Sequence, residues 1–186
     1  ERADEKTLRR WIDCGYGIAI VCGEISGGLE VLDFDECAET IFPNWRTKVE
    51  PILNRLPVVE TPGNGYHVYF RCEYSCPGLK IAQSNSGAVL IESRGVGNRI
   101  ISVTNPREIH SEDMEYIQVA GPVLPDIPIV SRSERIELWK RASEFDRLEI
   151  VERRVSKLKP ARSNYRGYQA SSGKLDRARK YISKMP

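Results

Sequence analysis

The sequence has little net charge and no long hydrophobic run. Its 28 lysines and arginines nearly balance its 26 aspartates and glutamates, so the formal net charge is only +2. No apolar stretch approaches the length of a transmembrane helix, and the first residues lack the pattern of a signal peptide. These absences predict a protein without a membrane partner. They also give no global electrostatic signal for nucleic acid.

A disulfide framework is also missing. The five cysteines are an odd number and are spread along the chain without compact spacing: Cys14, Cys22, Cys37, Cys72 and Cys76. This pattern is typical of a reducing compartment, so we expect a cytoplasmic protein, of a bacterial cell or a phage-infected host. The sequence begins without Met and stops inside a predicted helix, and we therefore expect a fragment of a longer protein.

Charge is less even along the chain than the total indicates. Between residues 140 and 184 the sequence holds 14 lysines and arginines against 5 aspartates and glutamates. A basic region of this kind can follow a phosphate backbone, although a solvated helix face is the commoner explanation.

Hydrophobic residues make up 40% of the chain, which is enough for one sizeable core. Apolar periodicity predicts helices over residues 4–14 and 131–155, and one or two helices within residues 36–56. Strands are predicted over residues 17–22, 29–35, 58–61, 66–72, 88–94 and 99–103. The first two of these strands flank a Gly/Ser-rich turn, so we interpret them as an antiparallel hairpin. Four prolines make residues 104–128 rich in loops.

Two carboxylates end the buried strand predicted at LEVLDFD. Asp33 and Asp35 are two residues apart, so in a strand both side chains point to the same face. Like charges this close repel each other unless a cation lies between them, and hard oxygen ligands suit Mg²⁺ or Mn²⁺ rather than Zn²⁺. The alternative is a strand that runs into a solvated acidic turn, and this stretch alone favours that alternative.

A second motif combines a glycine-rich turn with a histidine. The turn PGNG precedes the strand YHVYFRC, in which His67, Tyr69 and Arg71 alternate onto one face. Backbone N–H groups of such a turn can approach an anion, and His67 at its edge is placed to donate to a phosphate. The residue by itself is equally consistent with a structural histidine in a strand.

The third motif follows the apolar run AVLI. Glu92 and Arg94 end this run and lie two residues apart on one strand face. They are either a surface ion pair that contributes little, or a third metal-binding carboxylate with a phosphate-binding arginine beside it.

Together the three motifs supply three carboxylates, one imidazole and one guanidinium. We expect them at strand termini of one antiparallel sheet. Nucleotidyl transfer uses such a set, because three carboxylates can hold two divalent ions that activate a 3′-hydroxyl and stabilise the leaving pyrophosphate. The donors neutralise the triphosphate as charge moves onto it.

In their residues and their order, these motifs resemble those of the primase–polymerase domain of the archaeo-eukaryotic primase superfamily. The resemblance is closest to the bacterial and phage bifunctional primase/polymerase domain at the N-terminus of replication primases. It rests on GIAIVCGEISGGLEVLDFD (17–35), TPGNGYHVYF (61–70) and VLIESRGVGNRIISV (89–103). It implies an α+β fold, with an antiparallel RRM-like catalytic sheet, flanking helices, an N-terminal αβ unit and a helical C-terminal tail.

The resemblance also implies roles for single residues. Asp33, Asp35 and Glu92 would be the catalytic acids and would bind two divalent cations, Mg²⁺ or Mn²⁺. His67 would contact the phosphates of the incoming nucleotide, with Arg94 as a further contact.

Other positions carry over less closely from the resemblance. Lys80 would be another triphosphate contact, while Thr61, Asn64 and Gly65 would shape the turn over the phosphates. The chain has Tyr66 where other members carry Ser or Gly beside the histidine, which affects the details of base and sugar contact rather than the metal site.

Some members of the family carry a zinc insertion between the second and third motifs. Cys72 and Cys76 stand in that interval, but no second ligand pair follows, and His110 lies far along the chain. We therefore favour two thiols near a loop over a zinc site.

The implied function is that of a DNA primase/polymerase, which transfers a nucleotide from an NTP or dNTP to a 3′-hydroxyl on a single-stranded DNA template. Its setting would be replication of a phage, plasmid or integrated element, with a helicase as a domain or partner. One alternative is a non-catalytic single-strand-binding module on the same fold, and another is a metal-dependent nuclease with His67 as its base. The three acids argue against the binding module, because carboxylates repel phosphate when no metal is present.

The expected organisation has four parts. Residues 1–130 would form the catalytic core, 131–157 a packing helix, 158–173 a linker, and 174–186 the start of a further helical region.

Overall fold

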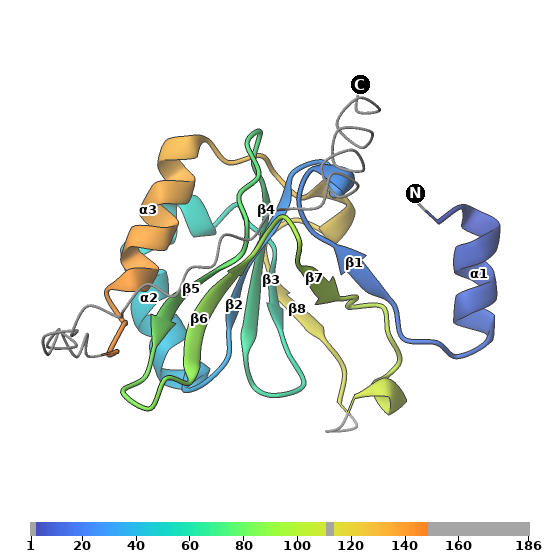
Figure 1. The fold of residues 1–186 in the computed structure, drawn as a ribbon, viewed down its shortest axis with the longest axis horizontal. Coiled ribbons are helices and arrows are strands. Elements are labelled where there is room, and N and C mark those ends of the chain that lie inside the picture. The colour runs from blue at the N-terminus through green and yellow to red at the C-terminus, as the bar shows by residue number, and fades with distance from the viewer. Residues whose placement is uncertain (1–2, 111–113, 149–186) are drawn as a thin grey trace, which may run out of the picture. The chain divides into compact units, whose positions relative to one another are not determined.

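A computed structural model describes residues 3–110 and 114–148 (Figure 1). Its helices are α1 (Glu5–Asp13), α2 (Ala38–Leu53) and α3 (Arg132–Ser143), with short 3₁₀ turns η1 (Glu24–Ser26), η2 (Arg107–Ile109) and η3 (Leu124–Asp126). Its strands are β1 (Ala19–Val21), β2 (Leu29–Phe34), β3 (Val58–Glu60), β4 (Tyr66–Arg71), β5 (Leu79–Gln83), β6 (Val89–Arg94), β7 (Arg99–Ile101) and β8 (Ile117–Ala120). The predicted linker at 158–173 and helical region at 174–186 lie outside the described residues.

Six of the strands form one antiparallel sheet, so the predicted α+β fold is confirmed. The strand order is β5-β6-β2-β4-β3-β8, which places β2 between β6 and β4. The sequence patterns did not predict the two edge strands, β5 and β8. Strand β8 lies within the proline-containing segment that was interpreted as loop.

The predicted hairpin between residues 17–22 and 29–35 is wrong. Strand β1 pairs with β7 in a separate two-stranded ribbon, while β2 pairs with β4 and β6 in the main sheet. Between β1 and β2 the backbone turns through Gly23, Gly27 and Gly28, all with positive φ. The chain therefore changes direction around η1 and enters a different sheet, and Gly23 in the turn forms an isolated bridge with Leu29.

Helices α2 and α3 cover one face of the main sheet (Figure 1). Strand β2 points Leu32 and Phe34 at α2, where Trp45 packs 4.9 Å from Phe34 between ring centroids. Residues 36–56 were expected to form one or two helices. They form one, which stays continuous through Pro43 because core packing compensates for the hydrogen bond that proline cannot donate.

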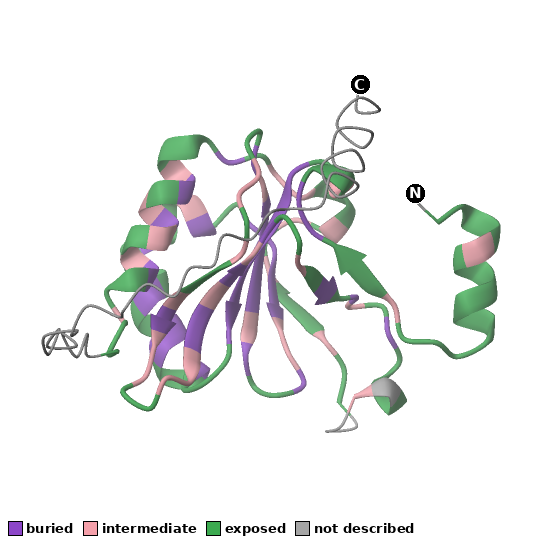
Figure 2. Cartoon of the chain, viewed as in Figure 1, coloured by how far each residue is buried: buried purple, intermediate pink, exposed green. Residues whose placement is uncertain are grey.

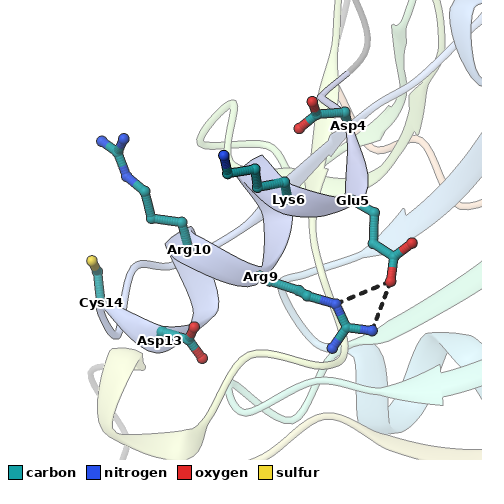
Figure 3. Close-up of a pocket in the computed structure, with 7 residues that line it drawn as sticks. All are labelled: Asp4, Glu5, Lys6, Arg9, Arg10, Asp13 and Cys14. Carbon is teal, nitrogen blue, oxygen red and sulfur yellow. Dashed lines mark hydrogen bonds and ion pairs between the residues drawn. The ribbon is translucent and has the colours of Figure 1, made fainter.

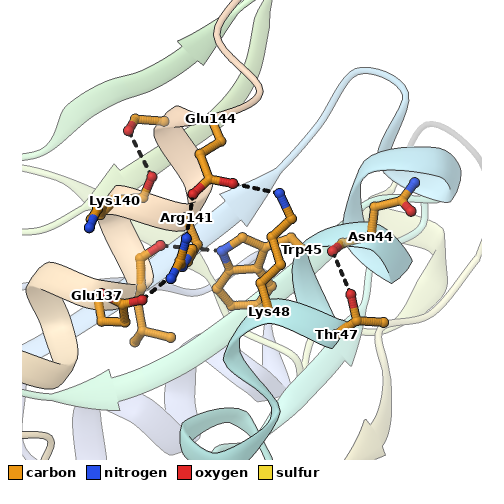
Figure 4. A network of polar contacts seen from close by, with 10 residues as sticks. Asn44, Trp45, Thr47, Lys48, Glu137, Lys140, Arg141 and Glu144 are labelled. Carbon is orange, nitrogen blue, oxygen red and sulfur yellow. Dashed lines mark hydrogen bonds and ion pairs between the residues drawn. The ribbon is translucent and has the colours of Figure 1, made fainter.

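Helix α3 begins at the predicted cap. Ser131 and Glu134 form a reciprocal capping box. The helix ends at Ser143 rather than continuing to residue 155, and the chain instead runs along the sheet edge, where Gln83 N donates to Asp146 Oδ1 at 2.8 Å. Figure 4 shows the polar contacts that tie α3 to α2, including the Trp45 indole N–H donating to the Leu138 carbonyl at 3.2 Å.

Helix α1 forms where it was predicted, with Asp4 as its N-cap. None of its residues is buried, and Figure 2 shows it almost wholly exposed. Its charged side borders a shallow pocket, drawn in Figure 3, in which Arg9 pairs with Glu5. This pocket shares no residue with the acids predicted to be catalytic. Over residues 3–110 and 114–148 we find no helix with both the length and the apolar character needed to cross a bilayer.

The second face of the sheet is only partly covered. A smaller apolar cluster lies there, in which Val31 and Tyr69 of the sheet pack with Cys22 and Ile100 beside the β1–β7 ribbon. Side chains alternate along β2, so Asp33 points to this same face.

Candidate active site

The site is built on a row of residues across three neighbouring strands. Asp33 of β2 lies directly opposite His67 of β4 on one side and Glu92 of β6 on the other. Residues directly opposite in antiparallel strands point to the same face, so these side chains meet. We expected them at strand termini, but Glu92 lies within β6. Lateral pairing, rather than shared strand ends, brings them together.

The three predicted acids come close enough to share a cation. One carboxylate oxygen each from Asp33, Asp35 and Glu92 lies within 4.8 Å of the others. Asp33 is buried, Glu92 is half-buried, and Asp35, just past the end of β2, is exposed. The group is therefore held in place at one end and open to ligand at the other.

Two basic side chains contact the buried acid. Arg94 Nε lies 3.1 Å from Asp33 Oδ2, and the Arg94 guanidinium also pairs with Glu92. His67 Nε2 lies 3.2 Å from Asp33 Oδ1, and His67 Nδ1 lies 3.1 Å from the Tyr69 hydroxyl. Burial tends to raise the pKa of Asp33, but His67 and Arg94 hold it below its ordinary value.

The pKa values of the other two acids, Asp35 and Glu92, are shifted upward. Although Asp35 is exposed as a residue, neighbouring groups remove part of the water around its carboxylate, and this desolvation, together with repulsion from Asp33 and Glu92, raises its pKa to about 6. Burial likewise raises the pKa of Glu92, and the Asp33 charge adds to it. This excess of negative charge fits a divalent cation, and an all-carboxylate donor set suits Mg²⁺ or Mn²⁺. The buried Asp33 Oδ1 also has no well-formed hydrogen bond among the described residues, so it has capacity for a further ligand.

The glycine-rich turn lies against the end of β2. Thr61 N donates to the Gly65 carbonyl at 3.0 Å, and Gly65 N donates to Thr61 Oγ1 at 2.9 Å. A Cβ on Gly65 would lie 2.4 Å from the Phe34 carbonyl oxygen, so glycine is needed for this close approach. Asn64 adopts a positive φ of 60°. The turn thus borders the space beside Asp35, but Asn64 and Gly65 face a neighbouring groove rather than the cavity over Asp33.

A cavity of about 510 Å³ opens over Asp33 and Asp35. Its wall includes residues that the sequence analysis did not assign to the site: Gly97, Asn98, Arg99, His110 and Tyr116. Arg99 had a detectable signal, because it follows a glycine-containing turn at the start of a strand. Tyr116 had no such signal, because it is far from His67 in the sequence. Folding places the centroids of the two rings 5.5 Å apart.

Lys80 and the cysteines lie away from the cavity wall. Lys80 is exposed on β5, directly opposite Glu92, where its charge favours the ionised carboxylate. Among the described residues, the His/Cys/Asp/Glu group with metal-binding spacing is Asp33, Asp35 and Glu92. That group contains neither Cys72 nor Cys76, both of which are free thiols.

A cluster of acids beside basic side chains, on an antiparallel sheet backed by helices, is an arrangement suited to metal-dependent phosphoryl and nucleotidyl transfer. Comparison with family models narrows this class. The chain belongs to the family of bifunctional DNA primase/polymerase N-terminal domains, whose model matches residues 1–132. A comparison with curated proteins found no match. Membership indicates primase/polymerase-type nucleotidyl transfer, with nucleic acid and nucleotides as substrates.

Proposed function

We propose that this chain is a template-directed DNA primase/polymerase that adds nucleotides from NTP or dNTP to a 3′-hydroxyl on single-stranded DNA. The observation that carries the proposal is the approach of Asp33, Asp35 and Glu92 to within 4.8 Å. The family match supports the same reaction class. The proposed cofactors are two divalent cations, Mg²⁺ or Mn²⁺, bound by these three acids.

The acids and the basic groups have separate tasks in this proposal. The bound cations would supply activation of the 3′-hydroxyl and charge stabilisation of the leaving pyrophosphate. Asp33 is held in position by Arg94 and His67, so its carboxylate needs little reorganisation when ligand binds. Asp35 is the exposed acid, and it is placed to face the reacting phosphate.

The cavity wall offers cations to a triphosphate. Arg94 and Arg99 both line it, and Arg99 is exposed at the start of β7. A guanidinium can contact two phosphate oxygens at once, so these arginines are the expected triphosphate contacts. His67 is 4% exposed and lies against Asp33, so we assign it first to orienting that acid, with phosphate contact through its remaining edge.

The proposed setting is replication of a phage, plasmid or integrated element in the cytoplasm, with a helicase domain or partner. This setting follows from the family resemblance. Replication in this setting also predicts that the reaction requires a single-stranded template.

Primer extension on a labelled, primed DNA template tests the function. We expect extension that requires Mg²⁺ or Mn²⁺ and falls at least about 100-fold in Asp33→Asn/Asp35→Asn, because both substitutions remove metal-ligand charge. Glu50→Gln, on an exposed position of α2, is the matched control and should extend like the parent.

Other outcomes separate the alternatives. Tight template binding without extension, unchanged by the double substitution, would favour a binding module. Shortening of the labelled strand would favour a nuclease. Extension that survives the double substitution would show that the metal site is elsewhere.

A further inference from the structure

A buried ion pair joins α3 to the central strand on the face opposite the acids. Glu30 lies on β2 and is 0% exposed, and Arg135 lies on α3 and is 5% exposed. Arg135 Nη1 donates to Glu30 Oε1 at 2.9 Å. Desolvation of two charges commonly offsets their attraction, so a buried pair is weak evidence for stabilisation and calls for a further explanation.

The pair holds one specific loop. Residues 72–78 connect β4 to β5. In this loop Cys76 N donates to Glu30 Oε1 at 3.0 Å, while Arg135 Nη1 also donates to the Tyr74 carbonyl. Both charged groups thus bind loop backbone as well as each other. The Arg135 guanidinium also lies over the Trp139 ring, at 5.1 Å from its centroid, which limits its motion.

The loop in turn fixes the 95–98 turn. Val96 N donates to the Cys76 carbonyl at 2.8 Å. A Cβ on Gly95 would lie 2.0 Å from the Cys76 carbonyl oxygen, and one on Gly78 would lie 1.9 Å from Asn98 Oδ1. Gly95 therefore lets the turn pack directly against the loop backbone, and Gly78 lets the loop pack against the Asn98 side chain, so a displacement of the loop should displace the turn.

The 95–98 turn extends to the face of the sheet that carries Asp33, which we call the catalytic face. It connects β6, which carries Glu92 and Arg94, to β7, which begins at Arg99. Asn98 and Arg99 line the cavity over Asp33. The Asn98 carbonyl also accepts from Cys22 N at 3.0 Å, which links the turn to the β1–β7 ribbon.

We propose that the Glu30–Arg135 pair is a positioning element for the nucleotide side of the site. It fixes the 72–78 loop, the loop fixes the 95–98 turn, and the turn sets the position of Arg99 at the cavity. The proposal rests on the proposed function in one respect, that Arg99 faces a triphosphate. The acids are positioned independently of it, because β2 and β6 pair directly with each other.

The test removes both charges at once. In Glu30→Leu/Arg135→Met the core stays apolar, so no unpaired charge is left buried and the chain should fold. The matched control, Lys48→Met/Glu144→Gln, removes a pair that also links α3 to the rest of the domain but lies outside the 72–78 loop. Amide hydrogen exchange, steady-state extension kinetics and Mn²⁺ affinity are measured for the parent and both variants.

We expect the double substitution to weaken nucleotide binding without changing metal binding. We expect amide exchange of residues 95–98 to be at least about 10-fold faster in Glu30→Leu/Arg135→Met than in the parent. We expect the nucleotide KM to rise about 10-fold while kcat stays within about 2-fold. Mn²⁺ affinity should be unchanged, and the control should match the parent in all three measurements.

Two results would overturn the proposal. One is unchanged exchange at residues 95–98 in the double variant, and the other is faster exchange with an unchanged nucleotide KM. If the double variant does not fold, Arg135→Lys replaces it, since lysine keeps the charge but has a shorter reach and lacks the planar guanidinium that lies over the Trp139 ring. A parent that extends no primer would instead overturn the proposed function, and the exchange measurement would still decide the link between the pair and the turn.

Discussion

At the scale of single residues, Asp35 is the acid most sensitive to its surroundings. Its pKa of about 6 comes from partial burial and from two neighbouring carboxylates. Protons and divalent cations therefore compete for the same group. Because the ionised form binds the cation, lowering the pH through 6 should weaken metal binding, and raising it above 7 should have little further effect.

This competition gives the first prediction. Mn²⁺ affinity, measured by calorimetry, should be about 10-fold weaker at pH 5 than at pH 7, since one proton must leave a group with a pKa near 6. In Asp35→Asn the affinity should be lower at both pH values, and its dependence on pH should flatten because the amide does not titrate. Equal parent affinity at the two pH values would contradict the assignment of Asp35 as a ligand.

At Gly65 the structure predicts a loss of stability when a side chain is added. In Gly65→Ala the new Cβ would lie 2.4 Å from the Phe34 carbonyl oxygen, which cannot move without shifting β2. We predict a loss of about 1–3 kcal/mol in the free energy of unfolding, measured in urea. Gly63→Ala is the matched control in the same turn. Its Cβ would meet nothing within 4 Å, so a change within about 0.5 kcal/mol is expected. Equal losses in the two variants would count against the close contact.

At the scale of elements, the sequence indicated which residues to consider for the site better than it indicated which strands and side chains lie next to each other. The acids, His67 and Arg94 were all identifiable, because each follows a clear apolar strand or a glycine-rich turn. The pairing of β1 with β7 was not, because the pattern of a strand does not specify which distant strand it joins. Tyr116 and the Glu30–Arg135 pair were missed for the same reason, since their partners are distant in sequence.

Helix α3 shows that the folded core extends past the family match, which stops at residue 132. Leu138 and Ala142 are fully buried against the sheet and α2. We predict that a chain of residues 1–148 unfolds cooperatively in urea, while a chain of residues 1–131 does not, because it leaves Trp45 and its neighbours without cover. Cooperative unfolding of the shorter chain would show that α3 is dispensable.

Two substitutions in α3 refine this prediction. Leu138→Ala should cost about 2–5 kcal/mol of unfolding free energy, because it opens a cavity at a buried position. Ile136→Ala, on the same helix but 51% exposed, should change it by no more than about 0.5 kcal/mol.

At the scale of the whole molecule, the small net charge conceals a separation of charge along the chain. Residues 149–186 hold 11 lysines and arginines against 3 acids, whereas residues 1–148 hold 17 against 23. The part of the chain that carries the acids is therefore net negative, which opposes binding of a nucleic-acid backbone. The attraction must come from local groups such as Arg94 and Arg99, or from the basic C-terminal residues.

We predict that residues 1–186 bind a labelled single-stranded oligonucleotide at least about 10-fold more tightly than residues 1–148 in low salt, because basic side chains release counterions from phosphates. Anisotropy titrations at several NaCl concentrations should also give a steeper salt dependence for residues 1–186. A variant of residues 1–186 with four basic residues neutralised, Lys174→Gln, Arg177→Gln, Arg179→Gln and Lys180→Gln, should fall between the two. Equal affinities and equal salt slopes would instead place all of the binding on the catalytic face, with its arginines outweighing the net negative charge around them.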